Sequence, residues 1–411
     1  MMEFRKDRKI YKIALLVALA CVLQISESLI PHLIPGLRLG LANMLTLTAL
    51  VVLGFSYALE VAVLRTVLSS FIIGTFMSPT FILSFSGAIV STFVMGFFYW
   101  LSRFHQRYHL SIIGISIIGA FTHNMVQLYL AYLILVKHDG IFVFFPWLAY
   151  GAVGTGWLVG VVTVGVCRRL TELPKQETPV RIKPDTTAPA SNAYAPGTSL
   201  LHRSPAEIKI GAIFVLAIAV LVFSDSWLYL GLFLFLAVMA PVSHTSFTFL
   251  FSKARRYSSL LGIAFLLPVF FNSGTHVLAT VPFTITSDGL STGGLFASRI
   301  LFLIVASTLL VRTTSPQEMT RGLAELLSPL RYLGVSEKRI ATILSLSWTA
   351  IPYLWETARN TIRVANFNKA KNLRNLVPLL SSLIATLYME TEPESIYWVD
   401  ASLEEEKLLT G

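Results

Sequence analysis

Long apolar segments separated by short polar stretches dominate the pattern of this chain. Its first part carries six such runs, each of about 20 residues, which is the length an α-helix needs to cross about 30 Å of hydrocarbon. The pattern therefore predicts six membrane-spanning helices within residues 1–170. They lie at roughly 11–30, 38–55, 57–76, 80–101, 110–136 and 144–167.

The second half repeats the apolar pattern and then departs from it. Four further apolar runs lie near 208–224, 227–243, 257–275 and 296–311. From about residue 313 to 388, apolar and charged residues alternate at helical spacing, which is typical of amphipathic helices at a membrane surface. The tetrapeptide Ser315-Pro316-Gln317-Glu318 is a helix-start signal. We predict an all-α polytopic membrane protein with amphipathic helices on its cytoplasmic side.

A stretch rich in Pro, Thr, Ser and Ala separates the two hydrophobic halves. It has no apolar periodicity, so we expect a flexible cytoplasmic linker. The chain then divides into a six-span domain over 1–170, the linker over 171–207, and a second membrane domain over 208–411.

Composition and charge support this architecture. Of the 411 residues, 55% are hydrophobic and 13% charged, about half the charge of a soluble domain, so a water-soluble core is excluded. The net charge of +10 comes from basic residues beside the apolar runs, such as Arg103 and Arg168-Arg169. This is the positive-inside bias, and it predicts a cytoplasmic N-terminus and no nucleic-acid partner. Lys253, Arg255 and Arg256 are assigned to a cytoplasmic loop.

Polar residues inside the spans are costly in hydrocarbon and are candidates for function. His123 and Gln127 share one helix face. Glu60 and Arg65 lie about 140° apart around one helix and need not pair, whereas Glu27, at a turn between spans, is assigned to the outer interface. We predict a substrate-binding set, with interhelical hydrogen bonding as the alternative role. Its members are Asn43, Arg65, His123, Asn124 and Gln127.

Other motifs are either structural or absent. Ala14 and Ala18, and likewise Gly156 and Gly160, form small-residue steps that allow close helix approach. The two cysteines stand in no CxxC or Cys/His cluster, and no second ligand accompanies His123 at metal-binding spacing. Nucleotide, protease and hydrolase motifs are missing, and so is any Asp-Asp pair for a metal-bound diphosphate. We therefore expect no catalytic residue, no metal and no cofactor.

The first half closely resembles a bacterial membrane family labelled heptaprenyl diphosphate synthase component I, also called the Gx transporter family. The matching strings are PGLRLGLANMLTLTALVVLG, LRTVLSSFIIGTF, SPTFILSFSGAIVSTFVMGF and SIIGISIIGAFTHNMVQLYLAY. The family is similar to the six-helix substrate-binding S components of energy-coupling-factor (ECF) transporters. The resemblance implies that Ala14 and Ala18 form the surface that docks on the partner module.

The second half resembles the transmembrane T component of the same transporters, through ASTLLVRTTSPQEM, LLSPLRYLGVSEKRIATILSLSWTAIPYLWETAR and LRNLVPLLSSLIATLY. In that family, cytoplasmic coupling helices end in Ala-Arg-Gly motifs that contact ATPase subunits. Here the nearest counterpart is Ala370-Lys371-Asn372. The resemblance implies an ATPase-coupling set in this region, made up of Glu356, Arg359, Arg363 and Lys371.

Together these observations predict a fused S–T subunit of an ECF-type importer in the cytoplasmic membrane of a bacterium. It would be non-enzymatic and would take up a small molecule such as a vitamin, a flavin or quinone, or an isoprenoid precursor. ATP would be bound by separate ECF-type ATPase subunits, and the lipid bilayer is the remaining partner. A membrane scaffold in isoprenoid, quinone or flavin-linked redox metabolism is the alternative, and a prenyl diphosphate synthase subunit is a third.

Overall fold

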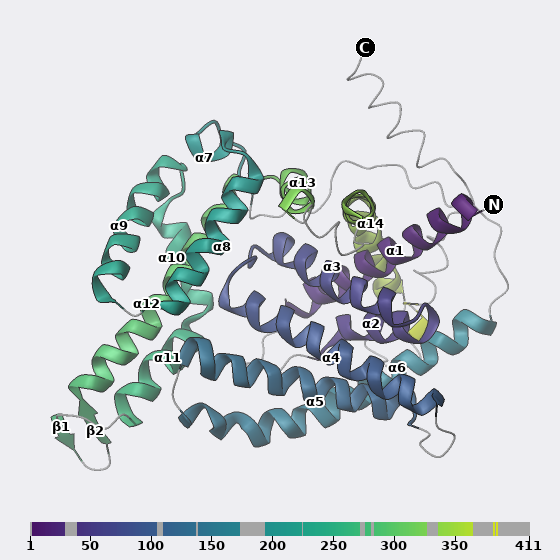
Figure 1. Cartoon of the computed structure of the whole chain (residues 1–411), viewed down its shortest axis with the longest axis horizontal. Helices are drawn as coiled ribbons and strands as arrows, with labels where there is room; N and C mark the ends of the chain where they lie inside the picture. Colours follow the sequence, from purple (N-terminus) through teal and green to yellow (C-terminus); the bar gives the residue numbers. More distant parts are fainter. Residues whose placement is uncertain are drawn as a thin grey trace.

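The computed structural model describes most of the chain, and every structural statement below concerns the described residues. These are 2–28, 39–104, 110–136, 139–172, 194–223, 225–271, 276–280, 283–326, 336–364, 381–382 and 384. In these residues the chain folds into bundles of α-helices and one small β-hairpin (Figure 1). The predicted all-α polytopic class is confirmed. Six described helices are long and apolar enough to cross a membrane, or seven if the bent pair of residues 247–271 is one span.

The N-terminal half forms one helical bundle. Helices α1, α2 and α3 pack on one another, α3 contacts α4, and α4, α5 and α6 form a continuous layer. A π-helical stretch, η1, extends α5, and a 3-10 turn, η2, leads into α6. The bounds are α1 Met2–Ser28, α2 Leu41–Val52, α3 Phe55–Ile73, α4 Pro79–Phe104, α5 Ile112–Leu130, η1 Ala131–Val136, η2 Asp139–Phe144 and α6 Phe145–Glu172.

The second predicted span is wrong in its length. Helix α2 has 12 residues and rises only about 18 Å, against about 30 Å of hydrocarbon. Gly40, which precedes the helix, has φ of 74°, and Gly54, which follows it, has φ of 101°. Both values lie in a region that side-chain-bearing residues avoid, so the two glycines limit α2 to a short buried helix.

Helices α5 and α6 approach closely because of the predicted glycine step. A Cβ atom added at Gly156 would lie 2.7 Å from the Cα of Ile117, and one at Gly160 would lie 2.7 Å from the Cα of Ile113. Side chains at these two positions would force the helices apart. The expectation that Gly156 and Gly160 serve close helix packing is confirmed.

The C-terminal half has a second bundle and two further helices. Its bounds are α7 Leu200–Arg203, α8 Ala206–Val222, α9 Ser226–Val242, α10 Phe247–Arg256, α11 Ser258–Phe271, β1 His276–Thr280, β2 Phe283–Thr286, α12 Ser287–Thr313, α13 Pro316–Leu326 and α14 Glu337–Val364. The antiparallel strands β1 and β2 pair Thr280 with Phe283 and His276 with Thr286. Helix α12 begins nine residues before the predicted apolar run, because the side chain of Thr286 caps it by accepting from the Gly289 amide.

Two parts of this half differ from the sequence prediction. The basic residues assigned to a loop belong to helix α10, which begins where Ser246 accepts a hydrogen bond from the Thr248 amide. The predicted linker, 171–207, includes helical residues at both of its ends, since α6 runs to Glu172 and α7 spans Leu200–Arg203. In contrast, the predicted start of α13 is confirmed. The Ser315 amide donates to Glu318 and the Glu318 amide donates to Ser315 Oγ, which is a capping box.

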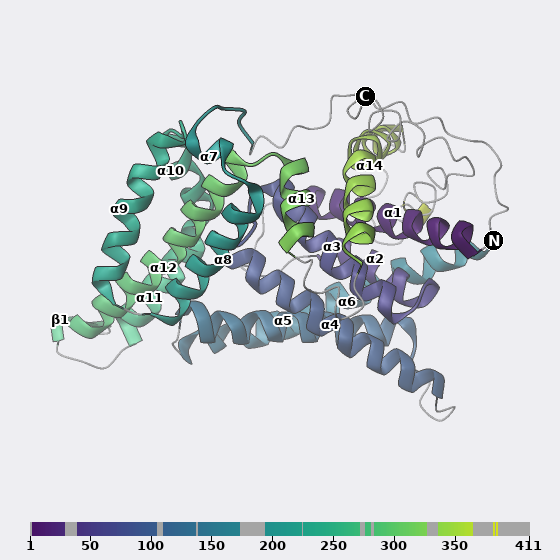
Figure 2. The same cartoon turned by 45° about the horizontal axis from the view of Figure 1, so that its top comes forward.

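The two bundles cross each other steeply. Helices α8, α9 and α12 run along one direction, whereas α1, α4 and α5 run across it, in both views (Figures 1 and 2). Helices α13 and α14 connect them, because α13 packs on α8 and α14 packs along α1. The N-terminal bundle and α12 therefore cannot both stand perpendicular to one bilayer.

The α5–α6 contact gives a first prediction. Gly156→Ala should destabilise the protein, because the added methyl group meets backbone atoms of α5. Gly154→Ala is the matched control on the same helix, since nothing lies within 4 Å of its added Cβ. Both variants gain the same helix propensity, so the difference between them isolates overpacking, about 1–3 kcal/mol. Unfolding free energies from SDS titration in mixed micelles measure it, and equal values for the two variants would contradict the packing.

Candidate functional site: a buried polar pocket and the contact between the two halves

All five predicted substrate-binding residues line one cavity inside the N-terminal bundle. The cavity has a volume of about 60 Å³ and lies among α1 to α6. Asn43 comes from α2, Arg65 from α3, and His123, Asn124 and Gln127 come from α5. The structure thus brings together residues that are distant in sequence. The other polar side chains of the lining are Gln24, Glu27, Thr66, Ser84, Ser91, Ser116 and Thr155.

Arg65 is the central charged residue of this pocket and is only 4% exposed. Its Nε donates to Thr46 Oγ1 at 2.9 Å, one terminal nitrogen donates to Gln24 Oε1 at 3.3 Å, and the other donates to Asn43 Oδ1 at 2.5 Å. Its partners come from α1 and α2, so the arginine ties three helices together. As expected, Arg65 and Glu60 do not pair with each other.

Glu27 is a pocket residue that the sequence prediction placed wrongly at the outer interface. It is 4% exposed and accepts hydrogen bonds from the backbone amides of Gly40, at 2.9 Å, and Leu41, at 3.3 Å. These amides open α2, where unsatisfied N–H groups and the helix dipole favour a negative charge. Glu27 therefore caps α2 from a distance of thirteen residues. Gly40 is the sequence feature that indicates a turn before α2, because its left-handed backbone conformation favours glycine.

The polar residues of α5 serve partly as structural links. His123 Nε2 and Gln127 Nε2 lie 3.1 Å apart, and the amide nitrogen of Asn124 donates to the carbonyl of Leu148 at 3.0 Å. A Cβ added at Gly87 would lie 3.0 Å from the His123 ring, so α4 leaves room for the imidazole. Asn124 thus makes an interhelical bond, while His123 and Gln127 line the cavity as a pair. No group of three metal-binding side chains occurs among the described residues.

The predicted docking residues Ala14 and Ala18 lie on a helix that packs along α14. Their side chains are 3% and 0% exposed. Ser347 of α14 is fully buried, and its Oγ lies 2.9 Å from the carbonyl oxygen of Ala14. A small residue at position 14 lets α14 approach the α1 backbone closely enough for this bond.

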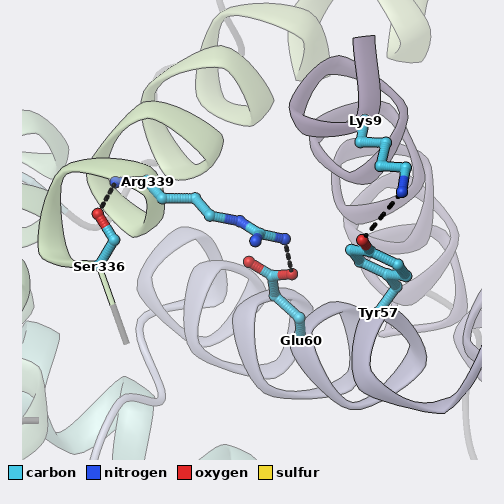
Figure 3. Close-up of polar contacts among 5 residues, drawn as sticks. All are labelled: Lys9, Tyr57, Glu60, Ser336 and Arg339. Carbon is cyan, nitrogen blue, oxygen red and sulfur yellow. Dashed lines mark hydrogen bonds and ion pairs between the residues drawn. The ribbon is translucent and has the colours of Figure 1, made fainter. Parts of the chain in front are cut away.

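An ion pair lies next to the same contact (Figure 3). Arg339 of α14 donates to Glu60 of α3 at 2.6 Å, with side chains 31% and 19% exposed. The Arg339 guanidinium also lies 5.7 Å from the ring centroid of Tyr57, and Lys9 of α1 donates to the Tyr57 hydroxyl at 3.4 Å. Glu60, first noted as a charged residue within a span, is therefore paired with the opposite half of the chain.

Two further contacts join the halves through α12. Arg299 is fully buried and donates to Tyr229 Oη at 3.1 Å and to the carbonyl oxygen of Ile134 in η1 at 3.2 Å. Ser307 donates to the carbonyl oxygen of Phe76, after α3, at 2.5 Å. The sequence prediction missed Arg299, although a lone arginine within the apolar pattern of α12 is a signal for a buried role.

The predicted ATPase-coupling residues lie only partly within the described structure. Glu356 and Arg359 are exposed on α14. Arg363 belongs to the last turn of that helix, but its side chain is outside the described residues, as is all of Lys371.

The Glu27 cap gives a second prediction. Glu27→Ala removes the acceptor for two backbone amides at the start of α2, and it should lower the unfolding free energy by about 1–3 kcal/mol. Glu27→Gln keeps one oxygen acceptor and should lose less. Glu325→Ala is the control, because its partner Arg321 is 85% exposed and surface changes cost within about 0.5 kcal/mol. Thermal melting of the full chain in detergent measures all three, and a loss no larger for Glu27→Ala than for the control would contradict the cap.

Comparisons with known proteins identify both halves. The family described as heptaprenyl diphosphate synthase component I matches residues 16–166, and the family described as cobalt transport protein matches residues 197–394. Both resemblances stated for the sequence are thus confirmed.

Curated relatives match the C-terminal half and share one name, energy-coupling factor transporter transmembrane protein EcfT. The relative from Listeria innocua is 30% identical over 213 residues, covering 49% of this chain and 80% of the relative. The relative from Bacillus subtilis is 28% identical over 208 residues, covering 48% and 78%. That from Brevibacillus brevis is 29% identical over 214 residues, covering 49% and 80%.

These names describe a membrane transport component, which agrees with the expected non-enzymatic role. Through its C-terminal half the chain belongs to the EcfT family, and it is a multi-pass membrane subunit of an ECF-type importer of the bacterial plasma membrane.

Proposed function

We propose that this chain is a fused importer subunit in which the N-terminal bundle binds a small molecule and the C-terminal half couples its transport to separate ATPase subunits. The observation that carries the proposal is that the pocket-bearing bundle is docked on α14. The docking helix α1 contributes Gln24 and Glu27 to the pocket and its Ala14 carbonyl to the α14 contact. A displacement of α14 would therefore act directly on a helix that lines the pocket.

The charge distribution supports a cytoplasmic N-terminus. Lys9, at the N-terminal end of the apolar span of α1, lies beside the contact that Arg339 makes from α14 (Figure 3). If α14 is a coupling helix, it faces the cytoplasm, and Lys9 shares that side. Basic residues are retained on the cytoplasmic side of membrane proteins.

The crossing of the two bundles supports transport by reorientation. Because α12 and the N-terminal bundle cannot both stand upright in one bilayer, the bundle must tilt as a rigid body if its own long apolar helices are to span the membrane. Such a tilt would move the pocket between the two sides, as in alternating access. A cavity of about 60 Å³ is also far below the ~300–1,000 Å³ of sites that enclose a whole vitamin-sized ligand, so the pocket must widen when the bundle moves.

The ATPase partner is inferred from the relatives and from the exposed face of α14. The relatives' name places them in ECF transporters, and α14 presents Glu356 and Arg359 to solvent. Helices α13 and α14 also border a groove of about 510 Å³ lined by Arg321, Lys338 and Trp348, among others.

The proposed cargo is a vitamin, a flavin or quinone, or an isoprenoid precursor.

A third prediction tests the coupling. The full chain, expressed with the ECF-type ATPase subunits of its own host and reconstituted in liposomes, should hydrolyse ATP as a complex. Arg359→Ala should reduce that hydrolysis about tenfold or more, as expected for loss of a central interface arginine. Arg103→Ala is the control, because Arg103 is an exposed arginine on α4. A complex that never forms, or an unaltered rate in Arg359→Ala, would favour a membrane scaffold.

A fourth prediction tests the docking of the two halves. With a protease site placed in the predicted linker, the cleaved halves should stay together in detergent through the α1–α14 contact. Glu60→Arg should reduce the retained fraction because it places two positive charges together. Glu60→Arg combined with Arg339→Glu should restore it. Retention is measured by affinity capture of the C-terminal half. If the double variant retains no more of the N-terminal half than Glu60→Arg does, the ion pair does not contribute to docking.

A further inference from the structure

We infer that the pocket receives the carboxylate or phosphate group of an anionic substrate, and that Arg65 is the residue that binds this group. The inference rests on the proposed function, because it treats the pocket of the N-terminal bundle as the substrate site. It narrows the substrate to anionic members of the proposed classes.

The first observation is the charge state of the pocket. Arg65 is 4% exposed, and the three described side chains that accept its hydrogen bonds, Thr46, Gln24 and Asn43, are all neutral. Arginine remains protonated in proteins, so a full positive charge is buried. Glu27 of the same lining attracts it electrostatically, but no described carboxylate forms a direct ion pair with Arg65. A buried charge is costly unless it is paired, and an incoming anion would supply the missing partner.

The second observation is the number of unused donors. A guanidinium group has five N–H bonds, and the described residues accept three of them, one on Nε and one on each terminal nitrogen. One N–H therefore remains on each terminal nitrogen. N–H groups of a guanidinium form strong, charge-assisted hydrogen bonds with carboxylate and phosphate oxygens. Because Arg65 lines the cavity, a ligand within it can reach these donors.

The third observation concerns Glu27, the acidic residue of the same lining. Its two oxygens already accept from the amides of Gly40 and Leu41, so its negative charge is directed at the start of α2. Glu27 thus offsets the positive end of that helix and attracts Arg65 without a direct contact, while Arg65 makes its hydrogen bonds with neutral groups alone. The other described residues of the lining include no carboxylate, lysine or further arginine, and Ser84, Ser116 and Gln127 among them suit the polar part of a ligand.

Arg299 shows why burial alone does not identify such a site. It too is fully buried, and its hydrogen-bond acceptors include the carbonyl oxygens of Ile134 and Phe223 together with Tyr229 Oη. Those contacts fix α12 against neighbouring segments. Arg65 differs in that it faces a cavity and shares it with the amide and imidazole groups of α5.

The test uses the purified full chain in phosphatidylcholine nanodiscs, with inorganic phosphate as the probe. The melting temperature should rise saturably with phosphate, beyond the effect of sodium chloride at equal ionic strength. Asn43→Asp places a carboxylate at the position of the amide that contacts Arg65 at 2.5 Å. This nearly isosteric variant supplies an internal anion, and it should weaken the apparent phosphate affinity about tenfold or more.

Further variants keep the test decisive. Arg65→Gln should abolish the phosphate response, and Arg103→Gln, a charge change at an exposed position of α4 outside the cavity, should retain it. Absence of a saturable response in the wild type, or an equal response in Asn43→Asp, would overturn the assignment. Nanodiscs containing phosphatidylglycerol form the last arm, because a lipid phosphate offers the same chemistry. If phosphatidylglycerol abolishes the phosphate response of the wild type, the anion is a lipid headgroup and the substrate assignment fails.

None of these measurements requires ATPase subunits. A positive phosphate result with failed ATP coupling would therefore refute the proposed importer mechanism alone. A negative phosphate result with intact ATP coupling would refute the anionic substrate alone.

Discussion

The burial of α1 on all sides is the constraint on which the arrangement of the whole chain depends. Eleven consecutive residues, from Ile13 to Leu23, are at most 8% exposed. A helix that is apolar around its full circumference must be enclosed, and the N-terminal bundle encloses only part of α1. Helix α14 from the other half supplies the remaining surface. The two halves are thus held together by a helix that belongs to one and is covered by both.

Three of the polar contacts between the two halves share a chemical form. Ser347, Ser307 and Arg299 each use a side chain of the C-terminal half to reach a backbone carbonyl of the N-terminal half. Phe76 lies in a turn, Ile134 in the π-helical stretch η1 and Ala14 within α1. Such contacts depend on backbone shape more than on side-chain identity, so they bind the N-terminal half as a rigid unit.

Sequence reasoning located most of the apolar helices, because their length and hydropathy match a membrane span. It also located the five polar residues of the pocket, because a polar side chain within a span is costly unless it faces a cavity or a partner. Charged residues with distant partners were harder to assign. Glu27 caps a helix thirteen residues away, and Glu60 pairs with a residue 279 positions away. Neither relation leaves a local pattern. Helix α10 was missed because a cluster of basic residues between two apolar runs was taken for a loop, without regard to the helical spacing of the apolar residues around it. Helix α2 was overextended because apolar residues continue beyond the glycines that end it.

Covalent fusion changes what the contact between the halves has to provide. In a single chain the second half is always at high effective concentration, so the interface need not supply the free energy of association between separate proteins. The Glu60–Arg339 pair fits that requirement, since partly exposed ion pairs contribute little net stability while mismatched charges are strongly disfavoured. It therefore sets the orientation of α14 on α3 more than the strength of docking. The apolar packing of α14 on α1 supplies the strength of docking, and the ion pair sets the orientation in which the two halves meet.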